Sequence, residues 1–207
     1  MTFPTNSMRF ITISGVDGSG KSTQLALLRE HIEKKGCTAA YFHATEFSAA
    51  NRLARLFRGQ KAFEPGKDRA VTDASWLSVV LREKFLLLDF LRFRFLRRRL
   101  EREHVDYLLS DRSFYDSLVN LSYLSDAWIV RVGRYVLDLF LPEADKAFYL
   151  DIDPEIVMSR ERVPEQGIGY LEAKRALFLA QAKRRNFIVI DAGRSKEAVF
   201  SDILGSL

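Results

Sequence analysis

A glycine-rich segment near the N-terminus constrains this 207-residue chain more than any other part of it. Residues 15–23 read GVDGSGKST and fit the pattern G-x-x-x-x-G-K-[ST] of a phosphate-binding loop, or P-loop. Glycines let the backbone turn tightly and approach a polyanion, so that successive N–H groups can surround phosphate oxygens. Residues 9–14 before the loop are apolar and β-branched, and the apolar residues after it have helical spacing. We therefore expect a strand, the loop and a helix, in that order.

The fixed positions of this loop have separate chemical tasks. Lys21 is expected to reach the β- and γ-phosphates of a nucleotide, and the Ser22 hydroxyl to bind Mg²⁺. The helix that starts at the loop adds its positive end. The alternative, an ordinary glycine-rich turn, is disfavoured by the strand–loop–helix context. The residues predicted to bind the nucleotide are Gly15, Asp17, Gly18, Ser19, Gly20, Lys21, Ser22 and Thr23.

Short apolar segments alternate with helical patterns along the whole chain, which is typical of a parallel sheet with helices on both faces. The length fits a single domain, residues 1–207. The predicted fold class is α/β, a P-loop NTPase with a five-stranded parallel sheet and a short lid at about 160–170. Strands are expected at 9–14, 38–44, 105–110, 146–151 and 186–191. Helices are expected at 20–35, 48–58, 73–103, 113–122, 127–140, 154–162, 170–184 and 195–206.

The segment 73–103 contains neither Gly nor Pro and is apolar on nearly every helical face. Such a helix is expected to be buried all round, either in the centre of the fold or partly under a second subunit, which favours a homodimer. An arginine-rich stretch overlaps its end. These arginines form a solvated basic end, or one or two of them hold an anionic acceptor in the P-loop cleft. A DNA-binding helix is the third option, and nucleic acid is not the expected partner.

A second group of candidate residues follows the predicted third strand. Asp111 ends this strand, where an acidic side chain is placed to hold Mg²⁺ or its waters, and Arg112 is expected to point across the cleft toward the transferring phosphoryl group. The alternative is an ordinary ion pair at the end of a strand. Farther along, Arg160 and Arg162 precede a segment containing Pro and Gly. This is where a lid over ATP would lie, unless the segment is a plain surface loop.

Composition narrows the class of protein. The formal net charge of +5 suits anionic ligands, nucleotides included. The single Cys37 cannot form an internal disulfide, which fits a reducing, cytoplasmic setting. The apolar run 85–91 is too short to span a bilayer and carries a charge, so no membrane association is expected.

With these motifs in place, the chain resembles the thymidylate kinase family of nucleoside-monophosphate kinases. The resemblance rests on GVDGSGKSTQ at 15–24, LLLDFLR at 86–92, SDR at 110–112 and FYLDIDPEIVMSRER at 148–162, with FIVIDAGRSKEAV at 187–199 also similar. It implies a nucleotide kinase that uses ATP and Mg²⁺ to phosphorylate a nucleoside monophosphate, with dTMP as the default acceptor.

The resemblance also assigns roles to residues. Asp17 would contact the acceptor sugar, and Arg112 would bind phosphoryl oxygens. Arg160 and Arg162 would act as lid arginines. The catalytic set is then Lys21, Arg112, Arg160 and Arg162. The expected acceptor-binding residues are Asp17, Leu88, Arg92, Arg112 and Ser117, and the expected metal-binding residues are Ser22 and Asp111.

The departures from the family pattern concern the acceptor. The run Arg-Glu-Pro-Gly after the second strand is replaced by residues 44–48, which contain no arginine. Leu88 stands where the family has the Phe that stacks on thymine, and losing that stack costs on the order of 1–3 kcal/mol. The alternatives are therefore a kinase of the same fold that acts on a nucleoside or another small phosphorylated metabolite, and an NTP-binding protein without turnover.

Overall fold

The computed structural model describes residues 8–49, 76–160 and 165–207. Five strands form one sheet in the order β2-β3-β1-β4-β5, and all four neighbouring pairs are parallel. The five strands predicted from the sequence are confirmed to within two residues at their ends. The strands are β1 Arg9–Gly15, β2 Ala39–His43, β3 Tyr107–Asp111, β4 Lys146–Asp151 and β5 Ile188–Asp191.

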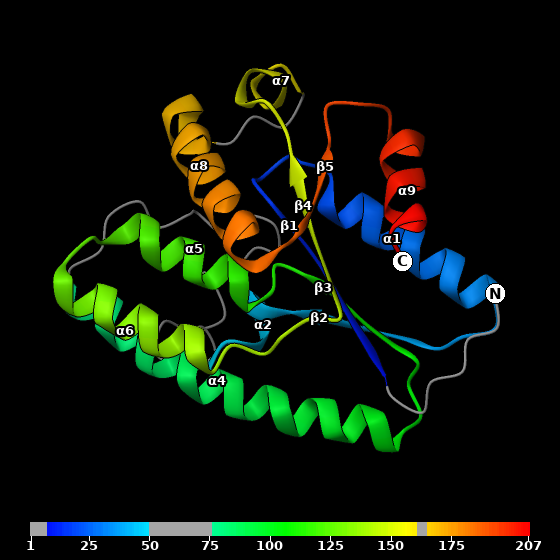
Figure 1. Cartoon of the computed structure of the whole chain (residues 1–207), viewed down its shortest axis with the longest axis horizontal. Coiled ribbons are helices and arrows are strands. Elements are labelled where there is room, and N and C mark those ends of the chain that lie inside the picture. The colour runs from blue at the N-terminus through cyan, green and yellow to red at the C-terminus, as the bar shows by residue number, and fades with distance from the viewer. Residues whose placement is uncertain (1–7, 50–75, 161–164) are drawn as a thin grey trace, which may run out of the picture.

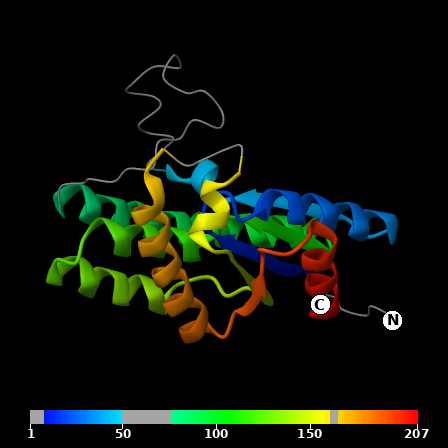
Figure 2. The ribbon, with the colours of Figure 1, turned by 90° about the horizontal axis from the view of Figure 1, so that it is seen from above.

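Helices cover both faces of the sheet, as expected (Figure 1). Helices α1 and α9 pack together on one face, and α4, α5 and α8 lie on the other. The view from above shows the same separation, with α1 and α9 away from α5, α6 and α8 (Figure 2). The helices are α1 Lys21–Lys34, α2 Ala44–Phe47, α4 Trp76–Arg102, α5 Phe114–Leu124, α6 Trp128–Leu139, α7 Pro154–Met158, α8 Gly167–Arg185 and α9 Lys196–Gly205.

One predicted helix is shorter than expected, and another falls largely outside the part of the chain that the structure describes. Most of the helix expected at 48–58 lies outside the described residues. The helix expected at 154–162 ends at Met158, and 161–164 also lie outside the described residues. Its start is as predicted, because Pro154 occupies the first turn and Asp153 caps the helix by accepting a hydrogen bond from the Glu155 N–H.

The register of the sheet brings the carboxyl ends of the strands to one edge. Ile13 in β1 and His43 in β2 both pair with Asp111 at the end of β3, and Gly15 at the end of β1 pairs with Leu150 in β4. Ligands of open parallel sheets bind at this edge. The fold thus places the glycine-rich loop beside the end of β3.

The core holds the strands and α4 together through a cluster of phenylalanines. Phe114 at the start of α5 meets the rings of Phe42, Phe90 and Phe93, with centroids 5.0–5.4 Å apart. Phe93 also contacts Phe10 in β1. These tilted and edge-to-face contacts are favourable ring geometries. They hold β1, β2, α4 and α5 in fixed relative positions.

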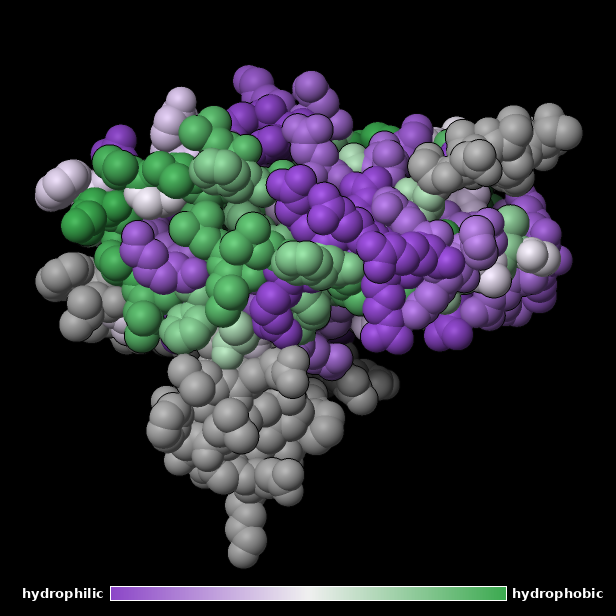
Figure 3. Space-filling view, turned by 90° about the horizontal axis from the view of Figure 1, so that it is seen from below, coloured by the Kyte–Doolittle hydropathy of each residue, from purple (hydrophilic) through white to green (hydrophobic). Residues whose placement is uncertain are grey.

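The expectation that the helix at 73–103 is buried all round is wrong for the monomer. One side of α4 is buried through Val79, Leu86, Phe90 and Phe93, but Leu81, Leu91 and Phe95 are 57–67% exposed. A helix lying on a sheet turns only one face toward it, so the opposite apolar residues stay uncovered by the chain. Together with the outer side of α6 they form a hydrophobic area, beside which the arginine-rich end of α4 is hydrophilic (Figure 3).

Candidate active site

The P-loop joins β1 to α1, and its backbone conformation and close contacts require glycine at several positions. Gly18 and Gly20 have φ values of 83° and 91°, a left-handed region that L side chains rarely adopt. A Cβ on Gly18 would lie 2.8 Å from Val157 Cγ1, and one on Gly15 would lie 2.6 Å from Ser19 Oγ. Gly20 precedes the first residue of α1. The loop therefore ends at a helix N-terminus, where free N–H groups favour an anion.

Lys21 is folded back over this loop. Its Nζ donates hydrogen bonds to the Gly15 carbonyl at 3.0 Å and the Val16 carbonyl at 2.8 Å. The residue is only 6% exposed, and burial, followed by the nearby Arg112 charge, lowers the pKa of its ammonium. Within the described residues its hydrogen-bond partners are these two neutral carbonyls, and a buried cation held in this way is well placed for an anionic ligand.

The two residues predicted to bind the metal lie together. The Ser22 hydroxyl donates a hydrogen bond to Asp111 Oδ2 at 2.5 Å, although the residues are far apart in the sequence. Asp111 Oδ1 is buried and has no hydrogen-bond partner within the described part of the chain. A hydroxyl oxygen beside a carboxylate with a spare oxygen is a donor set that suits Mg²⁺. The residues present therefore fit a magnesium ion bound with a nucleotide.

Arg112 directly follows β3 and has an unusual backbone conformation. Its φ is 57°, which is uncommon for a residue other than glycine and typical of constrained functional positions. The guanidinium donates to Asp17 Oδ1 in the P-loop, and the Arg112 carbonyl accepts from the Ala44 N–H at 3.0 Å. About a third of each side chain of the Asp17–Arg112 pair is exposed, so the pair faces solvent.

The structure adds Asp116, which the sequence analysis missed. Asp116 Oδ2 accepts hydrogen bonds from Ser14 Oγ at 2.7 Å and from the Ser113 N–H at 3.0 Å. Burial is the largest effect on this carboxyl and raises its pKa to about 6, while the Ser14 hydrogen bond opposes that rise. Ser113 and Asp116 form a capping box at the start of α5. The spacing S-x-x-D is the signal that predicts this box.

The predicted lid residues are only partly described. The Arg160 guanidinium donates to the Gly18 carbonyl, so this side chain already reaches the P-loop. Arg162 lies outside the described residues. Residues 167–170, which were expected to belong to the lid, form the first turn of α8.

On the acceptor side, Arg92 is held by other parts of the chain. Its Nη1 donates to Asp89 Oδ1 at 2.6 Å and to the Phe47 carbonyl at 2.8 Å, and its guanidinium lies 4.3 Å from the Phe47 ring centroid. Asp89 is 2% exposed and also accepts from the Ala49 N–H. Leu88, one turn before Arg92, is 46% exposed, and Ser117 is half-buried in α5. Asp89 was not among the predicted residues, although its i,i+3 spacing to Arg92 is a sequence signal.

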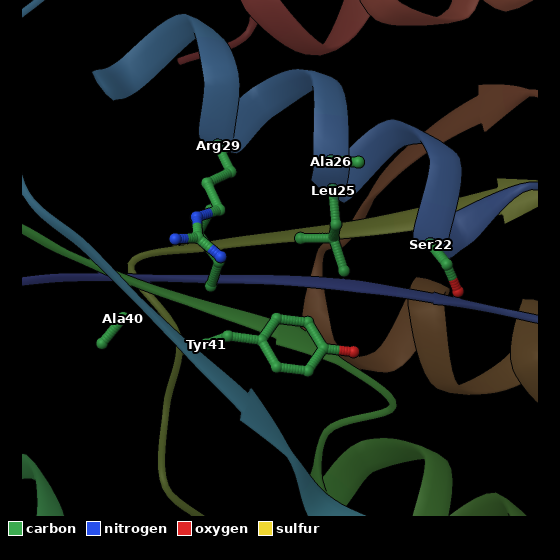
Figure 4. Close-up of a pocket in the computed structure, with 7 residues that line it drawn as sticks. Ser22, Leu25, Ala26, Arg29, Ala40 and Tyr41 are labelled. Atoms are coloured by element: carbon green, nitrogen blue, oxygen red, sulfur yellow. The ribbon is translucent and has the colours of Figure 1, made fainter. Parts of the chain in front are cut away.

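A pocket of about 340 Å³ lies beneath α1, between that helix and strands β2 and β3 (Figure 4). The Tyr41 ring lies under the helix, and its hydroxyl points along α1 in the direction of Ser22. Of the predicted site residues only Ser22 lines this pocket. Asp17 and Arg112 are not among its lining residues.

Comparisons with known proteins identify the family of this chain. The family model for thymidylate kinase matches residues 13–203. A probable thymidylate kinase of Pyrobaculum aerophilum is 27% identical over 204 residues, covering 95% of this chain and 94% of that protein. The thymidylate kinase of Shewanella loihica is 26% identical and covers 98% of this chain and 96% of that protein.

Solved structures share the fold. The thymidylate kinase of Candida albicans superposes with a TM-score of 0.66 at 15% identity, covering 97% of this chain and 91% of that one. The thymidylate kinase of Ehrlichia chaffeensis gives 0.60 at 19% identity, covering 97% and 98%. The match of the family model across nearly the whole length, together with an intact P-loop and the Asp111–Arg112 strand end, shows that this chain belongs to the thymidylate kinase family.

Proposed function

We propose that this chain is a nucleotide kinase that transfers the γ-phosphoryl group of ATP to dTMP, forming dTDP. The observation that carries the proposal is the meeting of the P-loop and the end of β3. Lys21 and Ser22 come from the loop side, and Asp111 and Arg112 come from the strand end. Phosphoryl transfer needs positioning and charge neutralisation more than covalent chemistry, and these four side chains supply both.

In this proposal the glycine-rich loop and the N-terminus of α1 hold the phosphates of ATP. Lys21 leaves the Gly15 and Val16 carbonyls and moves its ammonium to the β- and γ-phosphates. When bound, Mg²⁺ neutralises charge on the β- and γ-phosphates. Ser22 and Asp111 would hold the ion or its waters, a role supported by the unpartnered Asp111 Oδ1.

The acceptor would bind on the other side of Arg112. Arg112 reaches Asp17 in the P-loop, which supports a role in which Arg112 binds phosphoryl oxygens while Asp17 accepts from the sugar. Arg160, like Arg112, would stabilise the transferring phosphoryl group. Its contact with the Gly18 carbonyl of the P-loop supports this role. Arg162 is proposed for the same task from its place in the sequence alone.

A panel of acceptors tests the function directly. ADP release would be measured with ATP, Mg²⁺ and, in turn, dTMP, dUMP, other nucleoside monophosphates, thymidine and a sugar phosphate. We expect turnover with dTMP and weaker discrimination between bases than a ring at position 88 would give, because Leu88 has no aromatic face. Turnover restricted to thymidine or the sugar phosphate would replace dTMP with that acceptor. ATP binding without any turnover would favour a non-catalytic NTP-binding protein.

The metal assignment has its own test. Asp111→Asn keeps the shape of the side chain but removes its charge, so the variant should need more Mg²⁺ for half-maximal rate and should transfer phosphate more slowly. A Mg²⁺ titration of the rate, with ATP binding measured separately, checks both effects. An unchanged titration would leave Asp111 as a structural partner of Ser22 only.

We also propose a homodimer in a cytoplasmic setting. The exposed apolar side chains on the outer faces of α4 and α6 support the dimer, because contiguous apolar patches on monomers are usually covered by a partner. In the described residues, no helix has the length and apolar character that crossing a membrane requires.

A further inference from the structure

Lys174 is a buried lysine that the proposed phosphoryl-transfer mechanism does not use. It lies in α8 and is 4% exposed. Its Nζ donates to Asn120 Oδ1 in α5. Within the described part of the chain Lys174 forms no ion pair with a carboxylate. Lysine is rarely buried without an anionic partner, because removing its charge from water is costly.

Two tyrosines enclose this ammonium. Nζ lies 5.2 Å from the ring centroid of Tyr123 and 5.5 Å from that of Tyr170, and the two rings meet edge to face at 5.2 Å. Tyr170 and Lys174 are four residues apart on α8, and Asn120 and Tyr123 are three apart on α5, so each pair shares one face of its helix. The facing sides of α5 and α8 thus form a cluster of polar and aromatic side chains around one cation.

This cluster interacts electrostatically with charged residues of the proposed acceptor site. The charges of Asp17, Asp116 and Arg112 all act on Lys174, and Tyr170 is affected by Asp17 and Arg112. Asn120 is exposed, so the Asn120–Lys174 pair extends to the surface of the protein and does not lie in a sealed core. An ammonium has three donors, and Asn120 takes one of them. The remaining donors point to an oxygen-rich ligand.

The charges of the acceptor half explain why another cation is needed there. A nucleoside monophosphate brings a phosphate with nearly two negative charges into a region that already contains Asp17, Asp111 and Asp116. Arg112 is paired with Asp17, and Arg92 is paired with Asp89. The arginine that the family carries after β2 is absent from residues 44–48. Lys174 feels the charges of Asp17 and Asp116 but forms no ion pair with a carboxylate within the described residues.

We propose that Lys174 is a specificity-determining residue of the acceptor site, which donates hydrogen bonds to oxygen atoms of the sugar–phosphate of the nucleoside monophosphate. Asn120 orients the ammonium, and Tyr123 and Tyr170 shield it from water. This inference rests on the proposed function, since it places the residue beside the acceptor rather than beside ATP.

Kinetics and binding of single variants test the proposal. Lys174→Met keeps the length and helix preference of the side chain and removes its charge. We expect the KM for dTMP to rise by about 10-fold or more, the effect of losing one hydrogen bond to a charged group, while the KM for ATP changes little. Lys183→Met, on the exposed last turn of the same helix, is the matched control and should behave like the unmodified protein. An unchanged KM for dTMP in Lys174→Met would overturn the proposal.

Calorimetric measurement of dTMP binding and of thymidine binding, both without ATP, distinguishes a contact of Lys174 with the phosphate from a contact with the sugar. If Lys174 contacts the phosphate, Lys174→Met weakens dTMP binding and leaves thymidine binding unchanged. If it contacts the sugar, both ligands bind more weakly by a similar factor. Unchanged binding of both ligands would overturn the proposal. Absence of dTMP turnover by the unmodified chain would contradict the proposed function alone, because the binding comparison still decides the role of Lys174.

The pH dependence of dTMP affinity distinguishes a lysine that binds the acceptor from one that only supports the structure. Burial, more than the nearby Arg112 charge, lowers the pKa of Lys174 to about 8. The titratable and charged groups that face Lys174 are Asp17, Arg112, Asp116, Tyr123 and Tyr170. Arg112 stays charged over this pH range. Burial raises the pKa of Asp116 to about 6 and that of Tyr170 to about 12. The affinity of the unmodified protein for dTMP should therefore fall between about pH 7 and pH 9. In Lys174→Arg the side chain keeps its charge over this range, so the affinity of this variant for dTMP should fall less. Equal pH profiles of the variant and the unmodified protein would overturn the proposal.

Discussion

The charged side chains of the cleft are buried to very different degrees, and this determines what each substitution should do. Lys21 and Asp116 are almost fully buried, whereas Asp17 and Arg112 are about one third exposed. A buried charge interacts strongly with whatever replaces its lost water, while an exposed pair is screened. The clearest predictions at the scale of single residues therefore concern Lys21 and Asp116.

Lys21→Ala should lower kcat by at least about 10²-fold, because the ammonium would neutralise charge that develops on the transferring phosphoryl group. The protein should still fold, since the side chain contributes only two hydrogen bonds to loop carbonyls. Steady-state turnover of dTMP, with thermal melting as the control for folding, measures both effects. Near-normal turnover in a folded variant would remove Lys21 from the catalytic set.

Asp116 makes stability depend on pH. Because burial raises its pKa from 3.8 to about 6, the folded protein keeps this proton at pH values where the unfolded chain has lost it. Its contribution to the free energy of unfolding is therefore fully present below about pH 4 and is lost as the pH rises through about 6. The loss amounts to about 2–3 kcal/mol.

Asp116→Asn removes this titration. Urea unfolding at several pH values between about 4.5 and 7 should show that the difference in stability between the unmodified protein and the variant shifts in favour of the variant as the pH rises. Other carboxylates contribute equally to both proteins and cancel. Parallel curves would mean that Asp116 is not the group whose pKa is raised.

At the scale of elements, α5 holds the site together because its first residues serve both the core and the cleft. Ser113 and Asp116 cap the helix, and Phe114 between them is 2% exposed. Phe114 packs on Phe42 of β2 and on Phe90 and Phe93 of α4. The position of Arg112, two residues earlier, depends on this anchor.

Phe114→Ala should therefore destabilise the protein by about 3–5 kcal/mol, the cost of a buried phenylalanine truncated to alanine. Phe114→Leu, which keeps most of the volume, should cost clearly less. Denaturant unfolding gives both values. We also expect Phe114→Ala to lower turnover more than Phe114→Leu at a temperature where both remain folded. Similar stabilities of the two variants would show that the ring cluster is not a major source of stability.

For the whole molecule, the uncovered apolar area is the feature that the monomer does not explain. Along α6, Trp128, Val132, Tyr135 and Leu139 recur at helical spacing and are 54–75% exposed. They lie near the exposed leucines of α4, which packs against α6. A second copy of the chain that covered this area would remove it from water, and apolar burial drives such association.

Val132→Glu should convert a dimer into a monomer, because a carboxylate would be buried in the interface without a partner. Size-exclusion chromatography with light scattering measures the mass. Leu179→Glu, an exposed apolar position on α8, is the control and should leave the mass unchanged. A monomeric unmodified protein at micromolar concentration would contradict the homodimer proposal.

The sequence alone determined the local features of this protein. The five strands and the P-loop can be predicted from short stretches of sequence, because apolar runs, turn glycines and capping residues act on residues that are close in the chain. Gly18 and Gly20 illustrate this, since their left-handed backbone needs glycine whatever surrounds them. The family could also be inferred at this level, from four short motifs in order.

Only the tertiary structure decided which distant side chains meet. Ser14 and Asp116 are 102 residues apart, and Asn120 and Lys174 are 54 apart, yet each pair is hydrogen-bonded. Periodicity within one helix cannot give these contacts, because they depend on the strand order and on how α5 and α8 pack. The exposed side of α4 is a further example. Its sequence carries apolar residues on nearly every face, and only the packing of the helix determines which of them are covered.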